Sequence, residues 1–533
     1  MLTRTAFDPI QVEVWRHLLA AVAEEMGASL ERTAYSPNIK ERLDHSCALF
    51  DAQGQLLAQA AHIPVHLGAM PLMMQALLPR VEWRPGVMWL CNDPRVGGTH
   101  LPDLTLVAPV HAGRTLLGFV ASRAHHADIG GLSPGSLPLS TELFHEGLIL
   151  SPVRLVERGQ IREDVLDLVC ANSRTPNERR GDLAAQVAAN ETGIRRFQDL
   201  VERYGLPEFR KRTRENIAYA AEAVRQVLRS LPAGQSMATD YLDDDGAGQT
   251  DIPIRVTVTV RSSGTITFDF TGSAPQVRGS LNATEAITRS ACYYIVRCLV
   301  EEEIPTNEGC FAPVEVIAPE GTLVNARFPA PVAAGNTETS QRIVDTLLRA
   351  LAPFAPDRIP AASQGTMNNL TIGGYDPIRQ RPFAYYETIA GGAGASPQGP
   401  GTSAVQIHMT NTRNTPVETL ESHYPLRVLE VALADGTGGA GAHPGGNGLR
   451  RRLQLLTDAR VSLLTERRTH PPFGAHGGGP GAPGANRLHE PGKPERTLPG
   501  KWSENCPPGS ELTIRTPGGG GWGAPTEKTP PGD

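Results

Sequence analysis

The stretch GGTHLPDLTLVAPVHAGRTLLGFVASRAHHADIGG, residues 97–131, contains two apolar runs whose outer ends carry histidine, aspartate and glycine. The runs at 104–110 and 116–120 are separated by a short turn, which predicts two strands that fold back on each other. Such a hairpin would bring its two polar ends together, although about 25 residues separate them along the chain. These ends carry His100, Asp103, His125 and His126.

Imidazole and carboxylate groups that converge from two loops are the ligands that Zn, Mn and Fe ions bind in proteins. The glycine pairs Gly97-Gly98 and Gly130-Gly131 would allow the backbone to turn tightly beside such an ion. The chain has 15 histidines, so chance clustering of surface or core histidines is the competing interpretation. Spacing alone leaves both interpretations open.

The composition is ordinary for a globular protein, with 40% hydrophobic residues among 533. This length favours two or three domains over a single core. The net charge of -6 is spread over both signs without a basic tract, so we expect no nucleic-acid partner. No run of 18 apolar residues occurs, and residues 1–10 lack an apolar signal core, so no membrane association is expected. Seven scattered cysteines without a CxxC pair favour a cytoplasmic location.

Hydrophobic periodicity predicts an α+β, multidomain protein with mixed sheets, helical insertions and a Gly/Pro-rich C-terminal tail. The first helix is expected from Asp8 to about Tyr35, with an apolar face formed by Ile10, Val14, Leu18, Val22 and Met26. Further helices are expected at 68–78, 177–229, 284–300 and 340–351. Alternating apolar residues predict a hairpin at 254–260 and 266–270.

Changes in composition divide the chain into three expected segments. Residues 1–235 would form a domain with the metal site and the helical segment 177–229. Residues 236–470 would form a β-rich and helical domain with amide-rich loops. Residues 471–533 are dominated by glycine and proline, so we expect loop or an extended tail, partly disordered.

Two short motifs resemble known functional loops but lack the required context. Residues 131–135 match GxSxG, but Pro134 has no N–H for an oxyanion hole. Residues 436–441 match GxGxxG, but the following AHPGGNG cannot begin a helix. The chain also has no GxxxxGK[ST] motif. If ATP is used, we expect it to bind elsewhere than in a P-loop of this chain.

Uncharged polar clusters recur beside glycines at 336–342, 368–369 and 411–418. Amide-rich loops of this kind suit a pocket for a small polar, amide-like ligand. On residue types alone, turn and helix-cap chemistry is the favoured explanation of the same residues. Asn336, Glu338, Asn411 and Arg413 are our candidate substrate-binding residues.

Several longer motifs lie along the chain: ERLDHS (41–46), NDP with GGTHLPD (92–103), HHADIGG (125–131), EGL (146–148), RTP (174–176), Asp182, NTRNTPVE (411–418) and GGAG (438–441). Together they resemble the hydantoinase B/oxoprolinase family. This family comprises the HyuB-like subunits of N-methylhydantoinase, caprolactamase and acetone carboxylase, and the C-terminal half of eukaryotic 5-oxoprolinase. The resemblance extends from residue ~7 to ~525. Two departures, Arg95 and the Ala442-His443-Pro444 run, concern substrate choice more than chemistry.

The resemblance implies a division of labour between two subunits. A HyuA-like partner of the actin and sugar-kinase type would bind ATP and phosphorylate the amide or ketone oxygen. The HyuB-like subunit would carry a divalent metal, Mn, Zn or Fe, and complete the reaction. For this chain we therefore expect a hetero-oligomer that hydrolyses a small cyclic amide, with metal-activated water attacking the phosphorylated carbonyl.

Within that expectation, His100, Asp103 and His125 are the predicted metal ligands. Asp44, His126 and Asp128 are predicted catalytic residues that orient a ligand or serve as alternate ligands. His145 is a further, weaker candidate. Two alternatives remain: a subunit of an ATP-dependent ketone carboxylase, and a non-catalytic scaffold for the HyuA-like chain.

Overall fold

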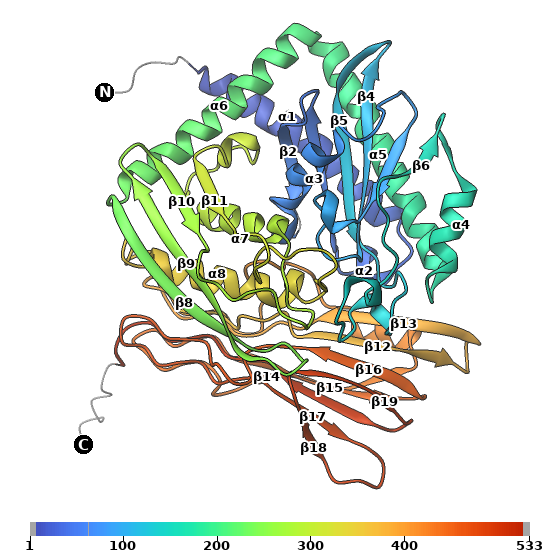
Figure 1. Ribbon diagram of the computed structural model, residues 1–533, viewed down its shortest axis with the longest axis vertical. Helices are drawn as coiled ribbons and strands as arrows, with labels where there is room; N and C mark the ends of the chain where they lie inside the picture. The colour runs from blue at the N-terminus through green and yellow to red at the C-terminus, as the bar shows by residue number, and fades with distance from the viewer. Residues whose placement is uncertain (1–6, 62, 526–533) are drawn as a thin grey trace.

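The computed structural model describes residues 7–61 and 63–525 (Figure 1). Helices and four sheets form this part of the chain, and one sheet contains a parallel strand pair, as the predicted α+β class with mixed sheets requires. No helix among the described residues is long and apolar enough to cross a bilayer. The domain boundaries near 235 and 470 stay a prediction, and one apolar core contains residues from both sides of 235.

Helix α1 (Pro9–Thr33) begins where the sequence predicts, because the Asp8 side chain accepts hydrogen bonds from the N–H groups of Ile10 and Gln11. The predicted apolar face is wrong at its N-terminal end, where Ile10 is 70% and Val14 42% exposed. A four-residue spacing turns by roughly 400°, so it drifts around the helix by about 40° per step. The buried face mixes three- and four-residue steps: Val12, Trp15, Leu19, Val22, Met26 and Leu30.

A seven-stranded antiparallel sheet contains the predicted hairpin at its centre. Helices α1 and α5 (Pro176–Tyr204) cover one face, and their apolar side chains share a core with that face. The other face packs toward α3 (Ala69–Leu77). Short helices α2 (Pro37–Lys40) and α4 (Glu163–Ala171) lie at its margins (Figure 1). The strand order is β2 (Leu56–Ala61), β1 (His45–Asp51), β5 (Thr115–His125), β4 (Asp103–Ala112), β3 (Met88–Cys91), β6 (Val153–Glu157) and β7 (Gln160–Ile161).

A four-stranded sheet follows the long helix α6 (Leu206–Ser230). The predicted hairpin is confirmed, since the alternating side chains of its two strands are buried. The predicted helices at 284–300 and 340–351 appear as α7 (Glu285–Cys298) and α8 (Ser340–Leu351), and α8 packs on this sheet. The strand order is β11 (Val314–Ile317), β10 (Thr265–Asp269), β9 (Thr250–Arg261) and β8 (Gly234–Asp244).

Two sheets at the C-terminal end pack face to face and enclose their own apolar core (Figure 1). The expectation of loop or tail after residue 471 is wrong, because four strands lie between 485 and 515. Residues 526–533 lie outside the described residues. One sheet has the order β13 (Arg381–Thr388), β12 (Asn369–Asp376), β16 (Ala459–Leu464) and β19 (Lys501–Cys506). The other, beside α9 (Val417–His423), has the order β14 (Leu426–Ala434), β15 (Gly448–Leu455), β20 (Glu511–Arg515), β17 (Ala485–His489) and β18 (Arg496–Leu498).

The glycine-rich segments form a bundle of backbones outside helices and strands. Hydrogen bonds run directly between segments, from the N–H of Gly439 to the carbonyl of Gly519 and from that of Gly519 to Gly446. A Cβ atom on Gly519 would lie 1.9 Å from the Ala393 carbonyl oxygen, and one on Gly445 would lie 2.0 Å from the Gly519 oxygen. Glycine is therefore required here for close backbone approach. The GxGxxG-like run at 436–441 is part of this bundle.

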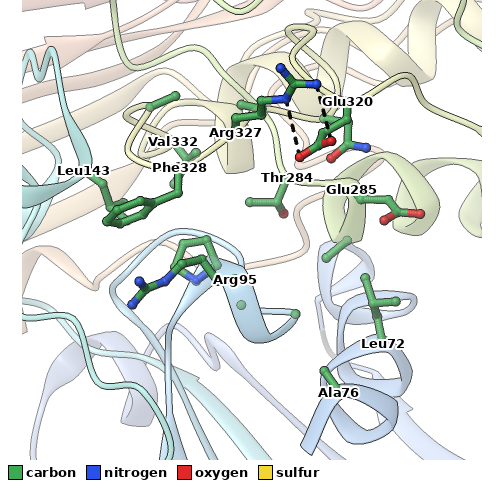
Figure 2. A pocket seen from close by; sticks show the side chains of 17 residues that line it. Leu72, Ala76, Arg95, Leu143, Thr284, Glu285, Glu320, Arg327, Phe328 and Val332 are labelled. Atoms are coloured by element: carbon green, nitrogen blue, oxygen red, sulfur yellow. Dashed lines mark hydrogen bonds and ion pairs between the residues drawn. The ribbon is translucent and has the colours of Figure 1, made fainter.

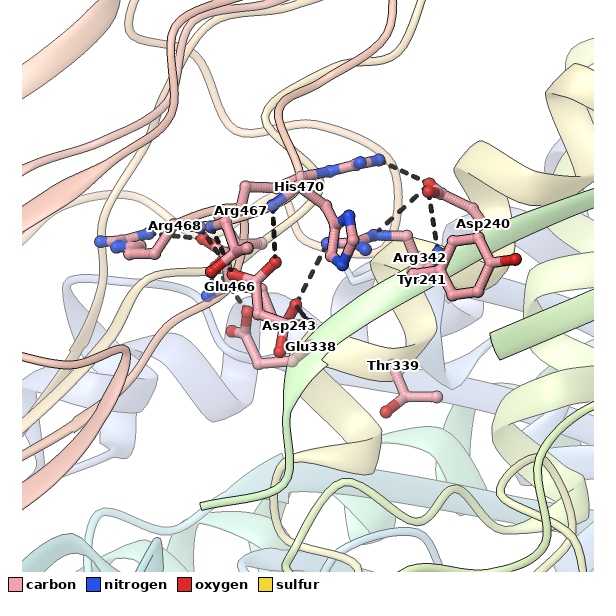
Figure 3. A network of polar contacts seen from close by, with 12 residues as sticks. Asp240, Tyr241, Asp243, Glu338, Thr339, Arg342, Glu466, Arg467, Arg468 and His470 are labelled. Atoms are coloured by element: carbon pink, nitrogen blue, oxygen red, sulfur yellow. Dashed lines mark hydrogen bonds and ion pairs between the residues drawn. The ribbon is translucent and has the colours of Figure 1, made fainter. Parts of the chain in front are cut away.

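A network of buried charges joins β8, α8 and the segment that follows β16 (Figure 3). Arg467 Nη2 lies 2.9 Å from an Asp240 oxygen and 2.6 Å from an Asp345 oxygen. Removing one member would leave a partner charged and buried, at a cost of roughly 3–5 kcal/mol. The network thereby holds the second sheet against the C-terminal sheets. It contains Asp240, Asp243, Arg342, Asp345, Glu466, Arg467, Arg468 and Lys501.

Candidate metal centre

The β4–β5 hairpin brings the two polar blocks together. Asp103 is the first residue of β4 and His125 is the last residue of β5, and the two are direct cross-strand partners. His100 lies in the turn immediately before β4. The antiparallel pairing that the two apolar runs predicted is thus confirmed, and it places all three side chains at one end of the sheet.

Three ligand atoms converge in this place. His100 Nε2 lies 3.1 Å from Asp103 Oδ1 and 3.1 Å from His125 Nδ1, and the last two atoms are 3.3 Å apart. Ligands at about 2.1 Å from one tetrahedral or octahedral ion are separated by roughly 3.0 to 3.4 Å. The three residues are at most 2% exposed. Their spacing and chemistry therefore fit one divalent ion.

Neighbouring groups orient two of these ligands. His100 Nδ1 lies 3.2 Å from the carbonyl oxygen of Ala333, so Nδ1–H donates to it and the Nε2 lone pair faces the other ligands. Asp103 Oδ2 accepts a hydrogen bond from the Thr99 hydroxyl, which leaves Oδ1 directed at the two imidazoles. Both arrangements favour the unprotonated ligand atoms that a metal ion needs.

Sequence reasoning missed one histidine beside the centre. His66, from the short 3-10 helix Pro64–His66, lies with Nε2 3.5 Å from Asp103 Oδ2, while its Nδ1 is 2.9 Å from the Ser46 hydroxyl. A Tyr386 ring stacks on the His125 ring at 4.6 Å between centroids. Neither residue could be recognised from its spacing to the HxxD block, because each belongs to an element that is distant in the sequence.

A small cavity opens between these side chains. Besides the three predicted ligands, two other predicted residues reach it: Asp44, and Asn336, whose Nδ2 lies 3.0 Å from His100 Nε2. Burial raises the pKa of Asp44 to about 7 despite the nearby Arg42. The remaining lining residues are Ile63, Val65, His66, His100, Asp103, His125, Thr337, Met367, Tyr386, Thr388, Thr410 and Thr412.

The electrostatics of the centre set its protonation. Burial opposes ionisation of Asp103, yet its histidine neighbours hold its pKa well below the ordinary value. Burial lowers the pKa of His125 to about 3. The pKa of His100 is raised, because Asp103 outweighs its burial. The centre therefore combines the ionised Asp103 carboxylate with the neutral His125 imidazole, which are two of the three ligand forms that a metal ion binds.

Two predicted catalytic residues lie outside the cavity. His126 directly follows the last residue of β5 and points away from His125, with its Nε2 2.9 Å from Gln186 of α5. Asp128 accepts hydrogen bonds from the backbone of Gly130 and Gly135 and pairs with Arg174. These contacts give Asp128 a role in holding the loop after β5.

The other predicted residues are distributed around the centre. Glu338 is fully buried and accepts from the Met367 N–H and the Asn369 amide. Asn411 and Arg413 line a separate polar depression that shares Thr412 with the metal cavity. The weaker candidate His145 lies at the surface, 3.1 Å from a Glu142 oxygen.

Glu146 holds the backbone segment whose carbonyl orients His100. One carboxyl oxygen accepts from the Ser140 hydroxyl and from the N–H groups of Val332 and Ala333, next to the carbonyl that orients His100. Burial raises the pKa of Glu146 to about 7. Since the folded protein then binds the proton more tightly than the unfolded chain, the contribution of Glu146 to stability falls as pH rises from about 4.5 to about 7.

Glu146→Gln is expected to remove this pH dependence, because glutamine resembles the protonated side chain but cannot ionise. Between pH 5.5 and pH 7.5, the free energy of unfolding of the wild type should fall by about 1 to 3 kcal/mol more than that of the variant. Urea denaturation of both proteins at the two pH values measures the difference. The same change in the free energy of unfolding between the two pH values in both proteins would contradict the assignment of a protonated Glu146.

Comparison with known proteins identifies a matching family and several similar proteins. Residues 8–525 match the family Hydantoinase B/oxoprolinase. An uncharacterized protein of Methanocaldococcus jannaschii is 40% identical over 98% of this chain and 92% of its own length. The 5-oxoprolinase 1 of Arabidopsis thaliana is 41% identical over 98% of this chain, but the match covers 42% of that protein. The chain thus spans less than half the length of the plant relative.

A solved structure has the same fold at moderate identity. The ATP-dependent caprolactamase from Pseudomonas jessenii is 30% identical, with a TM-score of 0.91 over 98% of this chain and 92% of that chain. The family match covers nearly the whole sequence and includes both strands and loops of the metal centre. The chain therefore belongs to the hydantoinase B/oxoprolinase family.

Proposed function

We propose that this chain is the HyuB-like, metal-carrying subunit of an ATP-dependent cyclic-amide hydrolase. The observation that carries the proposal is the buried trio of ligand atoms at 3.1 to 3.3 Å in a cavity whose rim has amide and hydroxyl groups. A HyuA-like partner would bind ATP and transfer a phosphoryl group to the lactam oxygen. The resulting imidyl phosphate is a far better electrophile than the lactam.

Two observations support a separate source of ATP chemistry. The sequence has no P-loop motif. The matched part of the plant 5-oxoprolinase covers less than half of that protein, so a large part of the relative lies outside the similarity. The likeness to an ATP-dependent caprolactamase favours a lactam as the substrate class.

The residues of this chain would prepare the hydrolytic step. A bound divalent ion supplies Lewis acidity and lowers the pKa of water. Asp44, with a pKa of about 7, can accept or release a proton at neutral pH. Ile63 and Met367 line the cavity with apolar surface that limits bulk water. Asn411 and Arg413, next to the shared Thr412, would recognise the polar edge of the ring.

The hydrolytic reaction is preferred over the two alternatives. A non-catalytic scaffold would need no converging ligand atoms, so the intact trio argues against it. Ketone carboxylation uses the same kind of activation, but the similarity at 30% identity is to an enzyme that acts on a lactam. Assaying the co-purified complex against lactams, hydantoins and ketones distinguishes these reactions.

The isolated chain is expected neither to bind nor to cleave ATP, and to leave lactams intact. Isothermal titration with ATP should be flat, while addition of the HyuA-like subunit should restore ATP-dependent ring opening. Micromolar ATP binding by the isolated chain would contradict the two-subunit proposal. Formation of a carboxylated product from a ketone, with no lactam opened, would instead support the assignment of the chain to a ketone carboxylase.

A further inference from the structure

The two histidine ligands differ in how their side chains are oriented. His100 donates through Nδ1 to the carbonyl of Ala333. That carbonyl follows Val332, which lines a cavity of about 420 Å³ outside the metal centre (Figure 2). His125 has no such hydrogen bond, because its Nε2 is buried and has no partner among the described residues. A contact of another kind must therefore hold the imidazole that presents Nδ1 to the other ligands.

The ring of Tyr386 supplies this contact. Its centroid lies 4.6 Å from that of the His125 imidazole, and the two planes differ by 20°, which is a stacked pair. The outer side-chain torsion of histidine is broad, so its packing decides the plane of the ring. Within the stacked plane, one of two orientations turns Nδ1 toward Asp103 Oδ1, at 3.3 Å, and the other would turn a carbon there. The stack therefore restricts the imidazole to the plane in which Nδ1 can act as a ligand.

Tyr386 is itself held at both ends, so its ring is a fixed surface. Its hydroxyl donates to Asn369 Oδ1 at 3.1 Å, and the Asn369 amide donates to Glu338 at 2.6 Å. Its backbone carbonyl accepts from Arg42 Nη1 at 2.6 Å. The Arg42 guanidinium carbon also lies 4.9 Å from the centroid of the Tyr386 ring.

Arg42 links the backbones of the two stacked residues. Its Nη1 donates to Asn38 Oδ1 at 2.7 Å as well as to the carbonyl of Tyr386. The Asn38 amide in turn donates to the carbonyl of His125 at 2.6 Å. Tyr386 belongs to β13 and His125 to β5, which are strands of different sheets. The orientation of one metal ligand thus depends on how a C-terminal sheet meets the first sheet.

We propose that Tyr386 is a positioning residue for the metal ligand His125, and that it acts through its ring and not through its hydroxyl. An imidazole coordinated through Nδ1 carries more positive charge than a free one, and the electron-rich face of an aromatic ring attracts such a group. The stack should therefore favour the coordinated form of His125 in addition to fixing its plane. This inference rests on the ligand assignment in the proposed function.

The test measures the Zn²⁺ affinity of the full chain, first stripped of metal, by competition with a chromophoric chelator. The double variant His100→Ala, His125→Ala gives the background binding. Tyr386→Leu removes the ring and should weaken Zn²⁺ binding about tenfold to a hundredfold, as the loss of groups that orient metal ligands does. Tyr386→Phe keeps the ring and removes the hydroxyl, so its affinity should stay close to that of the wild type.

Tyr385→Leu is the matched control for a general loosening of β13. Tyr385 is the adjacent residue and is 1% exposed, but its ring belongs to the core between the C-terminal sheets and does not line the metal cavity. The variant should lower the free energy of unfolding in urea and leave Zn²⁺ affinity unchanged. Equal weakening of Zn²⁺ binding in Tyr385→Leu and Tyr386→Leu would overturn the inference, and so would equal weakening in Tyr386→Phe and Tyr386→Leu.

The same titrations separate this inference from the ligand assignment. If the wild type binds Zn²⁺ above the background and Tyr386→Leu binds it equally well, the inference alone is overturned. If the wild type binds Zn²⁺ no better than the double variant, the ligand assignment is overturned together with the inference. Weak binding in Tyr386→Leu, with affinity retained in Tyr386→Phe and Tyr385→Leu, supports the role of the Tyr386 ring.

Discussion

Asp103→Ala should lose the divalent ion and lower product formation by roughly three orders of magnitude, because a bound ion stabilises charge in the transition state by several kcal/mol. Asp103 Oδ1 is the one carboxylate ligand atom in the trio, 3.1 Å from His100 Nε2 and 3.3 Å from His125 Nδ1. Without it, two neutral imidazoles remain, which is fewer than the three protein ligands of a catalytic ion. Elemental analysis and product assays of the complex measure both effects.

The same variant should separate the two half-reactions. Complex formation and phosphoryl transfer by the partner should persist, so that labelled phosphate is still released while ring opening stops. His145→Ala is the matched control, since that histidine lies at the surface beside Glu142 and should keep the metal. Full metal occupancy in a His100→Ala, His125→Ala double variant would refute the ligand assignment. Loss of ATP cleavage with an intact complex would instead place the ion before phosphoryl transfer.

Gly519→Ala should prevent folding or reduce the free energy of unfolding by about 3 kcal/mol or more. The added Cβ would lie 1.9 Å from the Ala393 oxygen and 2.2 Å from its carbon, and backbone atoms cannot rotate away as side chains do. Gly399→Ala is the matched control from the same glycine-rich region, since a Cβ there meets nothing within 4 Å. Soluble yield and urea denaturation compare the two. Equal stability would mean that the bundle tolerates side chains.

The central hairpin and the convergence of His100, Asp103 and His125 could be predicted because their signals are local. Two apolar runs joined by a short turn define an antiparallel pair, and pairing of its ends makes Asp103 the cross-strand partner of His125. His100 follows from its three-residue spacing to Asp103. The family resemblance extended this assignment across the chain. Alternation along an extended chain could have shown that His126 points away from His125, but the adjacency of the two histidines led to the prediction that both act at the centre.

Helix α1 illustrates the limit of a local pattern. Its start followed from the cap at Asp8, but its buried face was assigned from a four-residue repeat that drifts around the helix. Which of Ile10 and Val12 is buried depends on where α5 and the first sheet lie. Only the packed structure supplies that information.

The sequence by itself determined the α+β class, most helices and strands, and the meeting of His100, Asp103 and His125 at the end of one hairpin. Tertiary structure alone decided that His66, Asn336 and Tyr386 complete the cavity, because they come from segments that no local period relates. It also decided that the C-terminal glycines form a packed bundle and not a tail. A high glycine content is usually taken to indicate a flexible segment. Here the absence of Cβ atoms instead allows distant segments to approach closely and to form backbone hydrogen bonds.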